Sequence, residues 1–181
     1  MSQLVYVDET KAKRYVMAAV SLHAKHAVML WRTLRTLILP GQTNLHMRSE
    51  SDRRRHQIFR VLMPLLQQYG VGVALYDAGA RDSEVERRKR CLRAIVQAAG
   101  VHPRVSLIFE RDETLVQFDR QVLIQLLRET DLSARVSYEH INRRHDYLLA
   151  MPDVFAWCWN RGGRWRQAIR PHLSEVRTLA P

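Results

Sequence analysis

Short apolar runs of strand length alternate along this chain with longer segments of helical periodicity, and this alternation constrains the fold more than any other feature. Segments 71–76 and 105–109 are continuous apolar runs, which is the pattern of strands buried on both faces. Segments 82–99 and 114–128 carry apolar residues at helical spacing. Strands that alternate with helices predict a largely parallel sheet with helices packed on it.

The chain opens with two further predicted strands, at 4–9 and 14–22. The connection between them is so short that the two strands are expected to form an antiparallel hairpin. Helices are predicted at 23–39, at about 51–68 and at 147–159, and a further strand at 134–138. We therefore expect a single α/β domain over residues 1–181, with a mixed, largely parallel sheet, an N-terminal hairpin and flanking helices.

Basic residues outnumber acidic ones by 29 to 18, which gives a formal net charge of +11. Such a charge concentrates polyanions near the protein, and nucleic acid is the expected partner. Of the 29 basic residues only four are lysines, and a GC-rich genome produces the same skew toward arginine. The alternative reading is therefore that the arginine-rich composition reflects no functional demand.

The remaining composition bears on the compartment. Cys91 and Cys158 are the only cysteines, too few for a disulfide framework or a zinc site, so we expect buried thiols. No apolar run approaches the ~20 residues that a membrane span requires, and the N-terminus reads as a strand rather than as a signal peptide. These features predict a cytoplasmic protein without a membrane partner.

Acidic residues stand at the ends of apolar strands and inside one apolar helix. Asp8 ends the first strand, Glu110 ends the strand at 105–109, and Asp153 lies in an aromatic segment of the last helix. Buried carboxylates are rare unless they are paired or bound to a metal. Carboxylates that converge on two divalent ions support phosphodiester hydrolysis. Each acid taken alone can equally be a solvated turn residue, and Asp112 competes with Glu110 for the second position.

This order of acids resembles the ribonuclease H-like nuclease superfamily and, within it, an uncharacterised bacterial and phage group called domain of unknown function 3800. That group opens on a strand ending in Asp-Glu-Ser-Gly and has a Glu-aliphatic-His motif before a basic helix. Later in the chain, that group has a strand that ends in an acid and then a helix that contains an aliphatic-Ala-Asp motif. The corresponding segments here are Val5–Lys11, Asn44–His46, Ile108–Glu110 and Leu149–Asp153.

The resemblance implies a metal-dependent nuclease. It assigns Asp8, Glu110 and Asp153 as ligands of Mg²⁺ or Mn²⁺, with Glu9 and His46 as auxiliary catalytic residues. The chain departs from the pattern where Thr10-Lys11 replaces Ser-Gly, where Asn44 replaces Glu, and where Pro152 precedes the final acid. These departures favour a relative that binds nucleic acid without cleaving it.

Basic residues cluster in several stretches that predict contacts with the phosphate backbone, because arginine binds phosphate bidentately. The C-terminal stretch also contains Trp165, which we expect to be exposed and to stack a base, whereas Trp157 and Trp159 are expected in the core. The predicted nucleic-acid-binding residues are Arg53, Arg54, Arg55, Arg143, Arg144, Arg161, Arg164, Trp165, Arg166 and Arg170.

The sequence thus predicts a ribonuclease H-like nuclease that hydrolyses phosphodiester bonds in RNA or DNA by a two-metal-ion mechanism. The alternatives are a catalytically inactive nucleic-acid-binding module of the same fold and a subunit of a larger complex that contacts an acidic protein. A metal-independent, histidine-based ribonuclease ranks last, because no two histidines share a convincing local motif.

Overall fold

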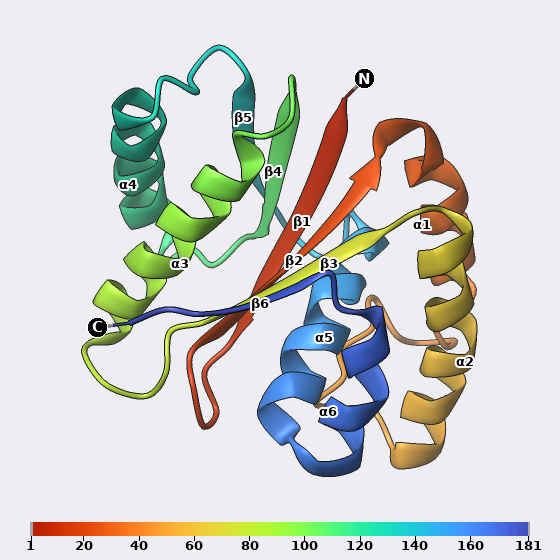
Figure 1. The fold of residues 1–181 in the computed structure, drawn as a ribbon. Coiled ribbons are helices and arrows are strands. Elements are labelled where there is room, and N and C mark those ends of the chain that lie inside the picture. The colour runs from red at the N-terminus through yellow and green to blue at the C-terminus, as the bar shows by residue number, and fades with distance from the viewer. Residues whose placement is uncertain (1, 181) are drawn as a thin grey trace.

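A computed structural model of the chain describes residues 2–180 and consists of three layers, with helices on both faces of one sheet (Figure 1). The strands are β1 (Gln3–Thr10), β2 (Val16–His23), β3 (Gly72–Asp77), β4 (Val105–Glu110), β5 (Val136–Ile141) and β6 (Glu175–Thr178). The helices are α1 (Ala27–Arg35), α2 (Asp52–Gln68), α3 (Glu84–Ala99), α4 (Val116–Glu129), α5 (Ala150–Arg161) and α6 (Gly163–Ile169), with short 3-10 turns at Ala24–His26, Tyr147–Leu149 and Arg170–His172.

The sheet is mixed, with the order β5-β4-β1-β2-β3-β6. Only β2 runs against its neighbours, since β1 and β3 both pair with it antiparallel, while β4 with β1, β5 with β4, and β6 with β3 are parallel pairs. The predicted hairpin and the largely parallel sheet are both confirmed. The central position of β1 places its end in the middle of the sheet edge.

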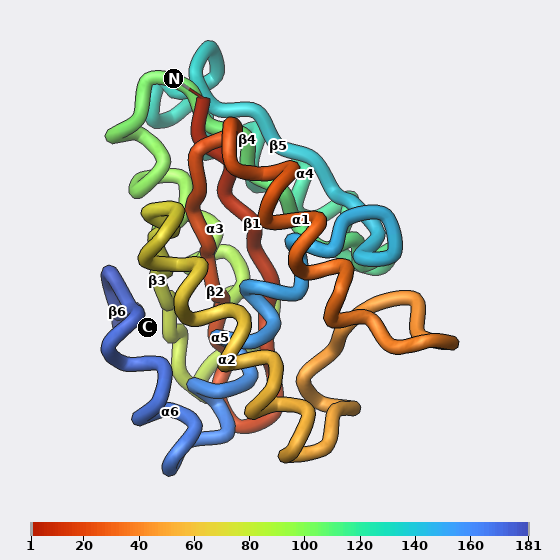
Figure 2. Tube along the Cα trace, turned by 90° about the vertical axis from the view of Figure 1, so that its right-hand side faces the viewer, coloured from red at the N-terminus to blue at the C-terminus, as the bar shows by residue number. Residues whose placement is uncertain are grey.

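Alternation along the strands divides the core into two halves. Tyr6 and Ala18 face the half formed with α1, α2, α5 and α6, whereas Val7 and Met17 face the half formed with α3 and α4. Successive side chains of a strand point to opposite faces, so each strand contributes to both halves. Figure 2 shows α1, α2, α5 and α6 beside the hairpin strands from the side.

Some elements differ from their sequence-based bounds. The first helix is shorter than 23–39, because a 3-10 turn precedes α1 and α1 ends at Arg35. α2 agrees with its predicted bounds and contains Pro64 within the helix. The C-terminal segment forms α6 and the edge strand β6, which sequence reasoning did not predict, because β6 has only four residues and alternates between half-buried and exposed positions.

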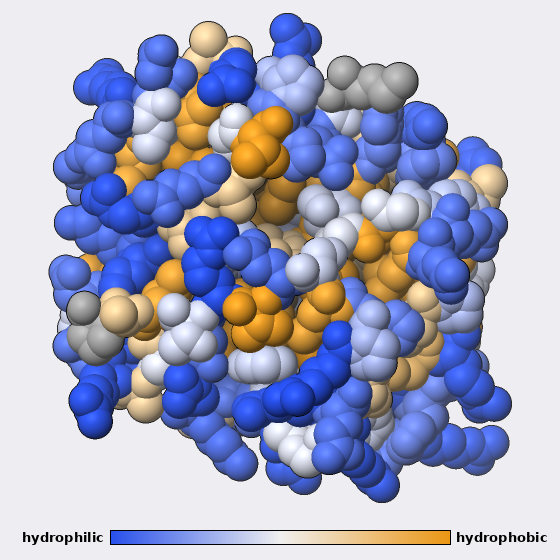
Figure 3. Space-filling model, viewed as in Figure 1, coloured by the Kyte–Doolittle hydropathy of each residue, from blue (hydrophilic) through white to orange (hydrophobic). Residues whose placement is uncertain are grey.

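The surface is largely hydrophilic on the face shown in Figure 3, with apolar side chains gathered toward its middle. A small cavity of about 130 Å³ lies between the sheet and α3, lined by residues such as Val5, Ala19 and Ile95. Among the helices of residues 2–180, none combines the length and the apolar character that crossing a membrane requires.

Candidate active site

Strand register brings Asp8 and Glu110 together. The parallel pairing of β1 with β4 aligns Tyr6 with Ile108 and Val7 with Phe109, so Asp8 and Glu110 follow as the next residues on neighbouring strands. Tyr6 and Ile108 both pack into the core half that contains α5. By the same alternation, Asp8 and Glu110 also project toward α5.

Asp153 reaches this point from α5, which packs against β1 and β2. The residue is 5% exposed, and both carboxylate oxygens are engaged. Oδ1 lies 2.8 Å from Nδ1 of His46, and Oδ2 accepts a 2.7 Å hydrogen bond from the backbone N–H of Met47. The side chain therefore ties the loop before α2 to α5, and it places His46 beside the strand-end acids.

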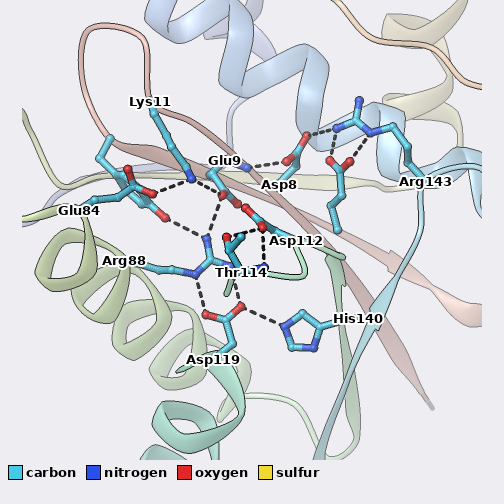
Figure 4. Close-up of polar contacts among 12 residues, drawn as sticks. Asp8, Glu9, Lys11, Glu84, Arg88, Asp112, Thr114, Asp119, His140 and Arg143 are labelled. Atoms are coloured by element: carbon cyan, nitrogen blue, oxygen red, sulfur yellow. Dashed lines mark hydrogen bonds and ion pairs between the residues drawn. The ribbon is translucent and has the colours of Figure 1, made fainter. Parts of the chain in front are cut away.

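Arg143, from the turn after β5, lies between these carboxylates. Its Nε donates a 2.5 Å hydrogen bond to Oε1 of Glu110, and its Nη2 contacts Oε2 of Glu110 and donates a 3.0 Å bond to Oδ2 of Asp8. Nη1 lies 2.9 Å from Nδ1 of His46 and 3.9 Å from Oδ1 of Asp153. Figure 4 shows the guanidinium directed at Asp8.

The electrostatics of this cluster favour a cation. Burial raises the pKa of Asp8 well above its ordinary value, and the carboxylates of Asp153 and Glu110 raise it further, while Arg143 acts in the opposite direction. Burial disfavours the charge on Arg143, but its hydrogen bond with Glu110 and the charges of Asp8 and Asp153 raise its pKa. One guanidinium thus partly neutralises three carboxylates.

The side chain of Glu9, predicted as an auxiliary, lines the same cleft but makes no hydrogen bond or ion pair with these carboxylates or with Arg143. It follows Asp8 on β1 and therefore projects to the opposite face of the sheet, toward α3. There its Oε1 lies 3.0 Å from Nη1 of Arg88 and 3.4 Å from Nζ of Lys11. The sequence contained the signal for this separation, because adjacent residues of a strand cannot share a face.

Arg88 is the centre of a second, buried polar network (Figure 4). Its guanidinium makes two hydrogen bonds of 2.6 Å with Asp119 and one of 3.0 Å with the hydroxyl of Tyr15. Nε2 of His140 lies 3.0 Å from Oδ2 of Asp119. This network joins β1, α3, α4 and β5 on the face opposite Asp8.

Glu110 and Asp112, the two candidates for the second metal ligand, have different hydrogen-bond partners. Asp112 accepts hydrogen bonds from the backbone N–H and the hydroxyl of Thr114 through Oδ1, at 3.0 and 2.6 Å. It therefore closes a turn after β4, and these bonds lower its pKa. Glu110, by contrast, shares Arg143 with Asp8.

A cleft of about 870 Å³ opens over the acids. Asp8, Glu110 and Asp153 line it together with His46 and Trp157. Basic side chains from several segments of the chain also line it, namely Lys11, Lys13, Arg48, Arg111, Arg143 and Arg161. Lys11, Lys13, Arg48 and Arg111 were not predicted for this site, because isolated basic residues in turns carry no local signal.

The predicted nucleic-acid-binding residues are spread over different environments. Arg143 and Arg161 line the cleft, and Arg53, Arg144, Arg164 and Arg170 are exposed. Arg54, Arg55 and Arg166 are half-buried and hold backbone carbonyls of Leu37, Met47 and Trp159, respectively.

Trp159 lies in the core as predicted, but Trp165 and Trp157 are placed differently from the prediction. Trp165 is only 6% exposed, because its ring packs against His56, Phe59 and Trp157. Base stacking requires an open ring face, so the buried Trp165 cannot provide it in this structure. Trp157, expected in the core, is half-buried and lines the cleft, with the guanidinium carbon of Arg55 at 4.4 Å from its ring centre.

Metal-ligand geometry is not preformed. Over residues 2–180 there is no group of three or more His, Cys, Asp or Glu side chains arranged to hold an ion. The three carboxylates converge on the guanidinium of Arg143 instead of on a common open point. Cys91 and Cys158, which were expected to be buried thiols, are both free and buried.

Comparison with known proteins defines the class of fold. No family model and no curated protein matches the chain. Among solved structures, the chain is similar to one chain of the structure of the PCNA–RNase HII complex from Archaeoglobus fulgidus, with a TM-score of 0.52 and 16% sequence identity. The similarity covers 86% of this chain and 71% of that chain. The protein therefore has a ribonuclease H-like fold.

Proposed function

We propose that this protein is a divalent-metal-dependent nuclease of the domain of unknown function 3800 type, which hydrolyses phosphodiester bonds in RNA or DNA. One observation carries the proposal. Three carboxylates from β1, β4 and α5, far apart in sequence, converge at one end of the sheet in a cleft lined by basic side chains.

The residues fit a hard divalent cation. Carboxylate oxygens are the ligands that Mg²⁺ and Mn²⁺ prefer, and the position between Asp8 and Glu110 already accepts the positive charge of Arg143. Asp8, Glu110 and Asp153 would hold the ions. Bound there, the ions would activate a water molecule as nucleophile and stabilise the leaving oxygen.

The remaining cleft residues would bind and orient the substrate. Lys13, Arg48 and Arg161 are exposed at the cleft and are not engaged in ion pairs among the described side chains, so they are available to phosphate oxygens. Nδ1 of His46 either donates to Asp153 or accepts from Arg143, depending on the tautomer. In both cases Nε2 is the atom from which His46 would exchange a proton with water or substrate.

A binding module without catalysis is the second candidate, and Arg143 is the observation that favours it. A guanidinium bound bidentately to Glu110 and also to Asp8 supplies a cation from the protein itself. If the guanidinium always stays bound to these carboxylates, the carboxylates are structural and the basic cleft only binds nucleic acid. Lys11, which stands where the resembling group has glycine, is 2.6 Å from Glu84 in an ion pair.

Substitution of Asp8 tests the nuclease proposal. We expect Asp8→Asn to reduce metal-dependent cleavage by more than about 100-fold, because even the outer-shell partners of metal ligands contribute about 10–100-fold. The assay uses end-labelled single-stranded RNA, duplex RNA, RNA–DNA hybrid and DNA, each with Mn²⁺, Mg²⁺ or EDTA. Glu113→Gln is the matched control, because Glu113 also lines the cleft but its side chain is 75% exposed.

The outcomes separate the two candidates. Cleavage that is lost in Asp8→Asn, kept in Glu113→Gln and blocked by EDTA supports the nuclease. Equal activity in parent and Asp8→Asn contradicts the assignment of the site. Binding without cleavage by the parent on every substrate supports the binding module.

A further inference from the structure

Arg143 occupies the oxygen atoms that a metal ion at this site would need. Both oxygens of Glu110 and Oδ2 of Asp8 accept hydrogen bonds from its guanidinium. Oδ1 of Asp8 accepts a 2.8 Å bond from the backbone N–H of Glu9, and Asp153 is engaged by His46 and Met47. A guanidinium and a divalent ion on the same oxygens would also repel each other, so the two cannot be bound together.

The guanidinium of Arg143 and the turn that carries it are held by different contacts. The polar contacts of its guanidinium are all with side chains of the site, namely Asp8, His46, Glu110 and Asp153. The turn that carries it is held separately, because the backbone N–H groups of Arg144 and His145 donate to Asn142. The side chain lines the open cleft. Rotation of its flexible stem would therefore release the guanidinium without unfolding the turn.

We infer that Arg143 is a positioning residue that competes with the divalent ion for Asp8 and Glu110. This inference rests on the proposed metal site. With Arg143 inserted, the guanidinium holds the carboxylates together and limits their repulsion. With an ion bound, Arg143 is displaced into the cleft. The protein then binds metal more weakly than its carboxylates alone would, because only the fraction with Arg143 displaced is competent.

Removal of the guanidinium should consequently tighten metal binding. We expect Arg143→Gln to bind Mn²⁺ about 10- to 100-fold more tightly than the parent, the range that corresponds to loss of a charged hydrogen-bonded competitor. Arg144→Gln is the matched control, because it removes the same charge from the neighbouring position, where the side chain is exposed. Arg143→Lys keeps the charge without the planar fork and should give an intermediate affinity.

The measurement is Mn²⁺ binding to the full chain without nucleic acid, by calorimetry and by the electron paramagnetic resonance signal of free Mn²⁺. Thermal unfolding in EDTA and in Mn²⁺ gives a second readout, because an ion that binds only the folded state raises its stability. Arg143→Gln should unfold at a lower temperature than the parent in EDTA and should gain more from Mn²⁺. If Arg143→Gln does not fold, Arg143→Lys carries the test alone.

The outcomes distinguish failure of the proposed competition by Arg143 from failure of the proposed metal site. Tighter binding in Arg143→Gln, but not in Arg144→Gln, supports competition by Arg143. Equal binding by parent and Arg143→Gln, or an equal gain in Arg144→Gln, overturns the competition and leaves the metal site standing. Absence of Mn²⁺ binding in the parent, in Arg143→Gln and in Arg143→Lys overturns both this inference and the proposed metal-dependent function.

Discussion

At the scale of single residues, Asp153 has two roles that differ in what they demand of its side chain. As a proposed metal ligand it must be an anion. As a structural acceptor it must present an oxygen to the buried backbone N–H of Met47, whose residue is 0% exposed. Asparagine can meet the second demand but not the first, because its amide oxygen accepts a hydrogen bond and carries no charge. The two roles can therefore be separated by substitution.

We expect Asp153→Ala to lower the free energy of unfolding by about 1–3 kcal/mol, because it leaves the buried N–H of Met47 without an acceptor. Asp153→Asn should cost clearly less, and both substitutions should abolish metal-dependent cleavage. Urea denaturation of the two variants and the parent measures the difference. Equal loss of stability in both would show that Met47 does not depend on the Asp153 oxygen.

At the scale of elements, strand β1 separates two polar clusters by directing adjacent acids to opposite faces of the sheet. Asp8 projects to the face with α5 and the cleft acids, whereas Glu9 projects toward Arg88 of α3. Arg88 and Asp119 are 1% and 0% exposed, respectively. Burial alone would raise the pKa of Asp119, but its hydrogen bonds with Arg88 and His140 lower it. The network therefore keeps a buried charge ionised directly behind the proposed site.

Breaking this pair should destabilise the fold strongly. We expect Arg88→Met to lower the free energy of unfolding by about 3–5 kcal/mol, because it leaves the Asp119 carboxylate buried without its partner. The double variant Arg88→Met/Asp119→Leu should recover much of this loss, since no unpaired charge remains.

Arg93→Met is the matched control on the same helix. Arg93 pairs with Glu129 at side-chain exposures of 47% and 40%, and exposed pairs contribute only about 0–1 kcal/mol. Denaturant titrations compare the variants. A loss in Arg88→Met no larger than that in Arg93→Met would show that the network is not a determinant of stability.

At the scale of the whole molecule, positive charge surrounds an acidic centre. The net charge of +11 raises the local concentration of polyanions, and basic side chains from the hairpin turn, from the loop before α2 and from the end of α5 meet at one cleft. These segments are distant in sequence, so only the folded chain concentrates their charge beside the proposed metal ligands.

We expect binding to single-stranded nucleic acid to weaken steeply with salt. Log K should fall linearly with log salt concentration, and neutralising one phosphate contact should reduce the slope by about 0.7. Arg161→Gln and Arg48→Gln should each show this reduction in fluorescence-anisotropy titrations. Arg120→Gln, which neutralises an exposed residue of α4 on the opposite side of the sheet, should leave the slope unchanged. An equal change in all three variants would mean that only net charge matters.

Much of the architecture was predictable because its signals are local. The hairpin, the parallel strands at 72–77 and 105–110 and the helices between them follow from apolar periodicity and from a short connection. Asp8, Glu110 and Asp153 could be recognised from the sequence, because acids at the ends of apolar strands and in an apolar helix are rarely buried unless they are paired. The short edge strand β6 and the burial of Trp165 were not predictable, because both depend on packing against segments far away in the chain.

The sequence by itself determined the order of strands and helices and the acids that end them, since the period of a strand or helix is set by its own residues. The tertiary structure decided which acids meet. It paired Glu9 with Arg88 and inserted Arg143 between Asp8 and Glu110, from positions 135 and 33 residues away. Such contacts depend on sheet order and on the reach of a long side chain, and neither quantity is encoded within a local segment.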